Sequence, residues 1–292
     1  MYSVMDNSSE HIRTTVKFSK MMSNFNNSFN TTESRNATND STNKPIFAII
    51  GFTLGVFGNV LALIVLVKSA KRHKWKVFYK MITTLAIVDL IGILTTSPIV
   101  IAVYSNHLQW VGGQGLCNYF SVMLIFSGLS TCLLIGAMAL DRYMAIVFPF
   151  KYRTIPKDKL AKFVISGILL SSAFVSFLPV FGLSHNIVHY PGSWCFPNFH
   201  STSVEDAMFA YFYSCLIIIL VLMTACLNIW AIARLIVGKR SDVRRGSNTN
   251  KSKTTRNVDV YIMVLLIVIF VVFAVCWTPF MVREFTLFSF LF

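Results

Sequence analysis

Residues 115–143 read GLCNYFSVMLIFSGLSTCLLIGAMALDRY. The first 26 of them contain no Asp, Glu, Lys or Arg, and the polar triplet Asp141-Arg142-Tyr143 follows. Arg142 lies 25 residues after Cys117, which is about 37 Å along a helix, or a bilayer with part of its interfaces. The stretch therefore predicts a membrane-spanning helix with Cys117 at one face and the triplet at the other.

Similar charge-free stretches recur along the chain. Of its 292 residues 55% are hydrophobic and only 13% charged, which disfavours a soluble domain. Since about 20 apolar residues suffice to cross a bilayer, six transmembrane helices are predicted. No strand pattern is visible. The expected fold is an all-α membrane protein, with a tail at 1–45 and a bundle at 46–292 whose helices cover about 46–68, 78–104, 115–148, 160–184, 206–237 and 257–285.

The basic residues indicate the orientation of these helices. The net charge is +14, and Lys and Arg gather in three loops, at 68–80, 142–162 and 234–256. The alternate loops, 105–114 and 185–206, contain none. This positive-inside pattern predicts that the three basic loops are cytoplasmic and that the N-terminus is extracellular. It favours anionic lipid and a cytosolic partner over nucleic acid.

The first 45 residues are rich in Asn, Ser and Thr. Such a composition predicts a disordered tail, although it also creates sequons by chance. Nothing before Ile46 resembles the apolar core of a signal peptide, so the first helix is expected to direct insertion. An extracellular tail favours glycosylation at the five N-x-[ST] sequons, Asn7, Asn26, Asn30, Asn36 and Asn39.

The six cysteines divide into two groups. Four fall within apolar helices, where they are expected to pack as small hydrophobic residues: Cys132, Cys215, Cys226 and Cys276. Only Cys117 and Cys195 reach the extracellular side. Because that side is oxidising, the sequence predicts a disulfide between these two.

Isolated polar groups interrupt the helices. A carboxylate at membrane depth is costly, so Asp89 is expected to face the bundle interior and meet a partner, an ion or water. Pro279, in CWTPF, predicts a kink near Trp277. Taken singly, Asn59 is equally well a packing polar group, and Pro279 a tolerated kink.

Taken together, these features resemble the rhodopsin-like family of G-protein-coupled receptors. The resemblance rests on GN in the first helix, LAxxD in the second, Cys and DRY bounding the third, a cysteine in the second extracellular loop, and CWxP in the sixth. It runs from Lys44 onward and implies a seven-transmembrane rhodopsin-like bundle. Only FTLFSFLF follows Glu284, so the chain is expected to end before the seventh helix.

The resemblance implies roles for several of these residues. Asp141 would hold Arg142 at rest, and the triplet that Tyr143 completes would couple to a heterotrimeric G protein on activation. Trp277 would face the ligand cavity while the sixth helix swings about Pro279. The alternative is that Asp141 and Arg142 form a mere juxtamembrane charge pair.

A second implied site lies in the polar core. Asp89, Asn59 and Thr131 resemble the buried sodium site of the family. An allosteric sodium ion is the one cofactor that the resemblance implies.

Residues near the predicted extracellular face narrow the class of ligand. Leu124 stands seven residues after Cys117, where receptors for biogenic amines carry an Asp. The fourth helix lacks a Trp and the fifth a Pro, as in prostanoid receptors. That branch has a YPxxWCF signature in its second loop, and residues 190–196 read YPGSWCF. Three more stretches resemble the branch: SPIVIAVY (97–104), QWVGGQGLC (109–117) and PFMVREF (279–285).

The prostanoid resemblance implies a ligand site under the second loop. Tyr104 and the hydroxyl of Ser193, where the branch has a Thr, would contact the ligand's carboxylate end. Val100 departs from a Thr of close relatives. Arg283 matches a sixth-helix Arg of the family and is expected at the rim, with a ligand anchor as the alternative, and the carboxylate anchor of the branch is a seventh-helix Arg. The remaining predicted contacts are Ser97, Leu124, Trp194 and Phe196.

The implied function is a plasma-membrane receptor for a prostaglandin, prostaglandin E2 above all. It would activate a G protein of the stimulatory type, which raises cyclic AMP. The alternative within the class is a receptor for another lipid or a peptide. A six-helix transporter or channel subunit should show several pore-lining charges or an internal repeat, and neither is visible.

No pattern favours an enzyme or a metal site. All six histidines lie in the tail, the loops and their edges. His185 and His189 have the i, i+4 spacing of a metal pair, but no third ligand accompanies them.

Overall fold

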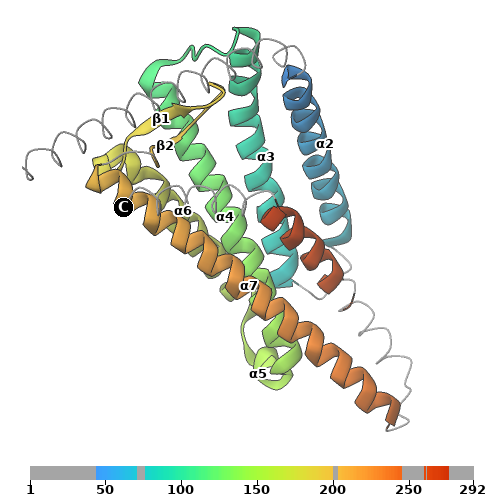
Figure 1. The fold of residues 1–292 in the computed structure, drawn as a ribbon. Helices are drawn as coiled ribbons and strands as arrows, with labels where there is room; N and C mark the ends of the chain where they lie inside the picture. The colour runs from blue at the N-terminus through green and yellow to red at the C-terminus, as the bar shows by residue number, and fades with distance from the viewer. Residues whose placement is uncertain (1–43, 71–75, 200–202, 245–259, 261, 276–292) are drawn as a thin grey trace, which may run out of the picture. The chain divides into compact units, whose positions relative to one another are not determined.

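The computed structural model describes residues 44–70, 76–199, 203–244, 260 and 262–275 (Figure 1). The chain divides into two compact units, Met1–Ile50 and Gly51–Phe292, and the sites below lie in the second. The elements are α2 (Lys44–Ala70), α3 (Lys76–Ser105), α4 (Gly113–Val147), α5 (Pro149–Thr154), α6 (Lys157–Phe177), the π-helical turn η1 (Pro179–Leu183), β1 (Asn186–His189), β2 (Trp194–Pro197) and α7 (Val204–Arg244).

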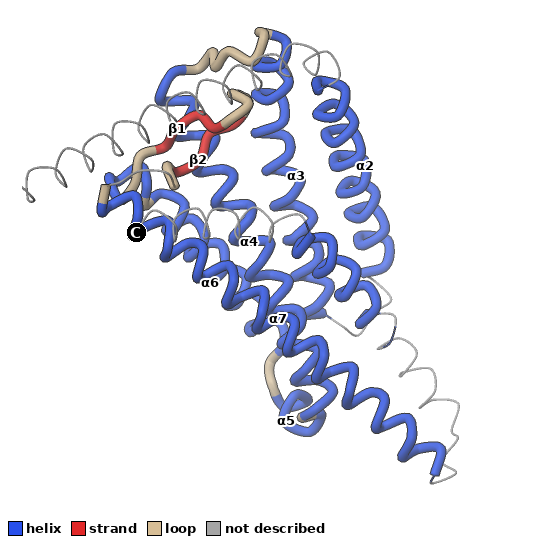
Figure 2. The backbone as a smooth tube through the Cα atoms, in the orientation of Figure 1, coloured by secondary structure: helices blue, strands red, loops and turns tan. Residues whose placement is uncertain are grey.

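Helix dominates the described chain (Figure 2). Five helical spans there are long and apolar enough to cross a membrane, with mean hydropathy between 2.1 and 2.6. A shorter apolar helix, Ile262–Val275, lies within the sixth predicted span, whose remainder falls largely outside the described residues. The spans are Ile46–Lys68, Val77–Ser105, Gly113–Val147, Lys157–Leu183 and Val204–Val237.

The centre of the bundle is α4. Over half of its most apolar window is buried, 56%, against 22–28% for the spans of α3, α6 and α7, which all pack against it. A helix that is apolar on all sides must be surrounded by lipid or by other protein segments. Over most of its apolar window α4 is surrounded by other helices. Its residues Ile125, Leu129, Leu134 and Met138 are essentially inaccessible. Groups at its two ends are therefore held on a rigid element.

The loop between η1 and α7 contains two strands, although the sequence indicated none. β1 and β2 pair antiparallel, with Val188 opposite Cys195 and His189 opposite Trp194. Strands of four residues are too short to show an alternating pattern, which is why the prediction was wrong. The connecting turn contains Gly192 at φ +104, a conformation that L side chains rarely adopt, and its Cβ would meet the Leu108 carbonyl oxygen.

The predicted fourth helix, 160–184, is not regular to its end. α6 stops at Phe177, and the Leu183 N–H donates to the Leu178 carbonyl at 3.2 Å across a wide turn. Pro179 cannot donate within a helix, and Gly182 has φ +96, so the regular helix cannot continue here. The chain then enters β1 in an extended conformation at Ser184.

The helical cysteines do not all pack inside. Cys132 is buried as expected, but Cys215 and Cys226 are exposed on α7. A membrane-spanning helix presents one face to lipid, which is as apolar as a protein core, so hydropathy alone does not distinguish these two environments. Cys276 lies outside the described residues.

Candidate functional site

A disulfide joins the hairpin to the N-terminal end of α4. Cys117 and Cys195 are bonded, as predicted, and their exposed fractions are 1% and 0%. With Phe120 they form a small buried cluster, against which Trp110 packs edge-on to Phe120 at 5.9 Å between ring centroids. The hairpin is thus covalently fixed over α4 (Figure 1).

A polar network that the sequence analysis missed holds the same hairpin. The Ser121 hydroxyl donates to the Asn186 side-chain oxygen at 2.7 Å, and the Asn186 amide donates to Asn118 at 3.0 Å. Gln114 donates to the Asn186 backbone carbonyl at 2.9 Å. The three α4 partners are spaced i, i+4 and i+7, so they share one helical face, and that spacing was a usable signal.

Three of the predicted ligand contacts lie in the hairpin or on the helix beneath it. Leu124 and Trp194 both pack on the disulfide cluster and on the main core. Phe196 is 1% exposed and lies 6.1 Å from Trp194 between ring centroids. Its ring also meets Tyr213 of α7 at 6.0 Å, a contact that sequence reasoning did not find.

The predicted polar contacts come from α3 and from the turn of the hairpin. Ser97 and Tyr104 are half-buried on α3, seven residues and hence two turns apart on one face. Ser193 is only 5% exposed, within the turn that joins β1 to β2. That its hydroxyl faces a ligand stays a prediction.

The two histidines of the loop have separate surroundings. His189 stacks on Trp194 at 4.7 Å between ring centroids. His185 is 70% exposed, and its Nδ1 lies 3.3 Å from Asp206 Oδ1. Within the described residues, no group of three His, Cys, Asp or Glu side chains could hold a metal ion.

At the other end of α4, Asp141 and Arg142 form a buried ion pair. Their exposed fractions are 7% and 1%, and Arg142 Nε donates to Asp141 Oδ2 at 3.0 Å. The guanidinium also lies 5.4 Å from the centroid of the Phe78 ring. Burying two charges is costly unless each is paired and hydrogen-bonded, so this cluster holds Arg142 firmly in place.

Tyr152, which the sequence analysis did not identify, completes this cluster from α5. Its hydroxyl donates to Asp141 Oδ1 at 2.7 Å. Burial, followed by the charge of the Asp141 carboxylate, raises the pKa of the Tyr152 phenol. The phenol therefore stays a neutral donor across the physiological pH range.

The opposite face of α5 is open. Phe150 is 83% exposed, although Tyr152, two residues on, is 7% exposed. Lys151 and Arg153 flank this position with exposed positive charge. A large apolar side chain in a basic setting is a candidate anchor for a protein partner.

In the predicted polar core, Thr131 is hydrogen-bonded to Asp89, whereas the Asn59 amide has a partner in its own helix. The Thr131 hydroxyl of α4 donates to Asp89 of α3 at 2.7 Å. Asn59 instead donates to the Gly55 carbonyl of its own helix at 3.0 Å. A helical Asn can satisfy its amide locally in this way, so a role of Asn59 in an ion site beside Asp89 stays a prediction.

Several predicted residues lie outside the described part of the chain. They are the activation residues Trp277 and Pro279, the rim residue Arg283, and the sequons at Asn7, Asn26, Asn30, Asn36 and Asn39.

Comparisons with known proteins agree on one family. Residues 58–289 match the family described as "7 transmembrane receptor (rhodopsin family)". The "Prostaglandin E2 receptor EP4 subtype" of Oryctolagus cuniculus is 35% identical over 206 residues, 70% of this chain and 42% of the relative. The Homo sapiens protein of that name is 34% identical over 71% of this chain and 43% of its own. The "Prostacyclin receptor" of Mus musculus is 30% identical over 83% and 59%.

The fold is similar to a solved structure as well. Squid rhodopsin superposes with a TM-score of 0.73 over 82% of this chain and 69% of its own, at 17% sequence identity. At that identity the likeness concerns the fold alone. The chain spans about two fifths of the length of the prostaglandin E2 receptors that it matches.

Proposed function

Since the chain belongs to the rhodopsin family of seven-transmembrane receptors, and to its prostanoid branch, we propose that it binds prostaglandin E2 and activates a heterotrimeric G protein. The predicted all-α, rhodopsin-like fold is confirmed, as is a receptor rather than an enzyme. The chain is a multi-pass membrane protein. Membership of a receptor family also excludes the transporter interpretation.

The disulfide-bonded hairpin is the observation that carries the ligand proposal. YPGSWCF forms its turn and second strand, and Trp194 and Phe196 present aromatic surface above Leu124. A fatty-acid-derived ligand needs an apolar cleft with few polar anchors. Ser193 and Tyr104 would supply hydroxyl donors to its carboxylate, and such charge-assisted hydrogen bonds are the stronger kind.

The buried cluster at the opposite end of α4 supports the signalling half of the proposal. Arg142 is held by Asp141, which Tyr152 in turn holds. Activation would release Arg142 toward the G protein, here of the stimulatory type, while Phe150 would anchor the partner on α5. Tyr143 would take part as the third member of the triplet.

The orientation belongs to the same proposal. The basic loops would face the cytoplasm of a cell with this receptor in its plasma membrane, and the Asn-rich tail would be extracellular and glycosylated. Cys117 and Cys195 support this, because a disulfide forms in an oxidising compartment. A glycosidase applied to intact cells should then reduce the apparent mass of the protein.

The ligand is tested by the cyclic-AMP response to prostaglandin E2 in cells that express the complete coding sequence. Ser193→Ala and Tyr104→Phe should each raise the half-maximal concentration about tenfold, since each loses a hydrogen bond to a charged group. Ser171→Ala is the matched control, because that hydroxyl bonds to its own helix at Ile168. A response to another prostanoid at lower concentration, or none at equal surface expression, would overturn the proposed ligand.

A further inference from the structure

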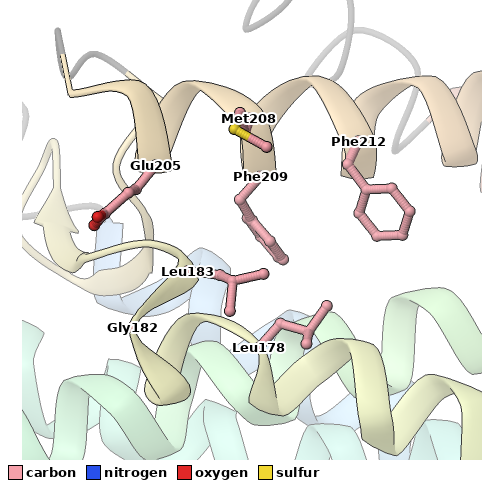
Figure 3. A pocket seen from close by; sticks show the side chains of 7 residues that line it. All are labelled: Leu178, Gly182, Leu183, Glu205, Met208, Phe209 and Phe212. Carbon is pink, nitrogen blue, oxygen red and sulfur yellow. The ribbon is translucent and has the colours of Figure 1, made fainter.

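A cleft of about 480 Å³ opens between the end of α6 with η1 and the start of α7. Its walls are Leu178 and Leu183 on one side and Met208, Phe209 and Phe212 on the other, with Glu205 as the one charged lining residue. Figure 3 shows Phe209 pointing across the cleft toward Leu183. The size lies within the range of small-molecule sites.

Polar contacts fix the two walls at their outer end. Asp206 of α7 is 2% exposed, and its Oδ1 accepts hydrogen bonds from the Ser184 hydroxyl at 2.9 Å and the His185 N–H at 2.6 Å. Its Oδ2 accepts one from Ser203 at 2.7 Å. η1 and the first turn of α7 are therefore clamped together, and the cleft is a built feature rather than a frayed end.

The cleft opens sideways at the outer end of two membrane spans. Its walls belong to Lys157–Leu183 and Val204–Val237, and the neighbouring hairpin contains the disulfide that marks the extracellular side. Met208, Phe212 and Leu183 are 68%, 48% and 47% exposed. Apolar side chains so exposed on a spanning helix face the hydrocarbon of the outer leaflet.

Glu205 selects the chemistry of the occupant. It stands four residues, one turn, before Phe209 on the same face of α7, at the level where hydrocarbon gives way to water. An ionised carboxylate only accepts hydrogen bonds, and it repels other anions. A free fatty acid, a prostanoid carboxylate or a phospholipid phosphate would meet that repulsion, whereas a neutral hydroxyl would donate to it.

We propose that this cleft binds a neutral membrane sterol, with the ring system between Leu183 and Phe209 and the hydroxyl donating to Glu205. The cleft shares none of its lining residues with the proposed prostaglandin contacts. Phe209 stacks on Tyr213 at 6.1 Å between ring centroids, and Tyr213 meets Phe196 of the β1–β2 hairpin, which would form the lid of the proposed prostaglandin site. A continuous row of rings therefore joins the sterol cleft to the proposed prostaglandin site.

The test is photolabelling of the receptor in phosphatidylcholine vesicles with a cholesterol analogue that carries a diazirine. Label should map to residues 178–183 and 205–212, and unlabelled cholesterol should compete for it whereas palmitate should not. Met208→Trp fills the cleft from an exposed position and should abolish this label. Glu205→Leu should weaken it about tenfold through loss of the hydrogen bond.

Two variants separate the proposal from general adhesion of lipid. Phe163→Trp changes a residue of α6 that is 80% exposed and remote in sequence from the cleft, and it should leave the label unchanged. Glu205→Gln removes the charge and should let palmitate compete. Label outside the two segments, competition by palmitate in the wild type, or label that survives Met208→Trp would overturn the proposal. None of these outcomes depends on prostaglandin binding.

Discussion

At the scale of single residues, Tyr152 most changes the view of the Asp-Arg-Tyr triplet. An adjacent acid and base could be a simple surface pair, worth little because water screens it. Here Asp141 and Arg142 are buried, and the second carboxylate oxygen is satisfied by Tyr152. A buried charge left without one of its hydrogen bonds is costly, so the tyrosine stabilises whichever state keeps the pair intact.

Tyr152→Phe should therefore raise signalling in the absence of ligand. The substitution keeps the ring and removes the hydroxyl, which donates to Asp141 and accepts from Arg142 at 3.5 Å. This loss should shift the resting equilibrium about tenfold. Basal cyclic AMP, normalised to surface expression, measures this shift. Tyr119→Phe is the control, since Tyr119 is 44% exposed on α4. Unchanged basal signalling with a lowered thermal stability would mean that Tyr152 is only structural.

At the scale of elements, the β1–β2 hairpin is held by two independent devices. The disulfide fixes β2 to α4, and the Asn186 network fixes β1 to the same helix. Both strands are therefore tied to the most buried helix of the bundle. A lid held at one strand could open at the other, whereas this one is held on both sides.

Ser121→Ala should loosen the lid on the β1 side. It leaves the Asn186 side-chain oxygen buried without its 2.7 Å donor, a loss that should speed prostaglandin dissociation about threefold to tenfold. The off-rate of tritiated prostaglandin E2 from membranes is the measurement. Ser105→Ala removes a hydroxyl that bonds to Ile101 of its own exposed helix end and should change nothing. Equal off-rates in both variants would show that the Ser121 hydrogen bond does not hold the lid.

At the scale of the whole molecule, α4 connects the two proposed sites. Cys117 lies near its N-terminal end and Arg142 near its C-terminal end, with the Thr131–Asp89 hydrogen bond between them. This bond joins α3 to α4 at a depth where a carboxylate is costly without a partner. Carboxylate and hydroxyl oxygens also suit a sodium ion, which would favour one relative position of the helices.

Replacing sodium by choline in the buffer should raise the affinity for prostaglandin E2, by about fivefold at a typical coupling energy. Asp89→Asn should abolish this dependence, because the neutral amide no longer attracts the cation. Competition binding in membranes measures both affinities. Asn59→Ala should retain the sodium response, since its amide is satisfied by Gly55. A sodium effect that survives Asp89→Asn would refute the site.

The sequence by itself determined five of the predicted spans, the disulfide and the family. These properties depend on the local cost of placing charge and backbone in hydrocarbon, and on which two cysteines reach an oxidising face. Short motifs such as YPGSWCF narrowed the family to its prostanoid branch. Each span and each motif is a property of residues that are neighbours in the sequence, so it could be predicted without knowing how the helices pack.

Only the tertiary structure decided which partners these residues meet. Tyr152 lies 11 residues after Asp141 and Asn186 lies 65 after Ser121, and no local pattern predicts either hydrogen bond. The Asn59 amide donates to the Gly55 carbonyl of its own helix, which the sequence did not indicate. The cleft beside Glu205 lies where α6 ends at Phe177, and hydropathy does not show that helix end. A hydrogen bond is selected by the three-dimensional approach of two groups, which depends on the packing of the whole chain.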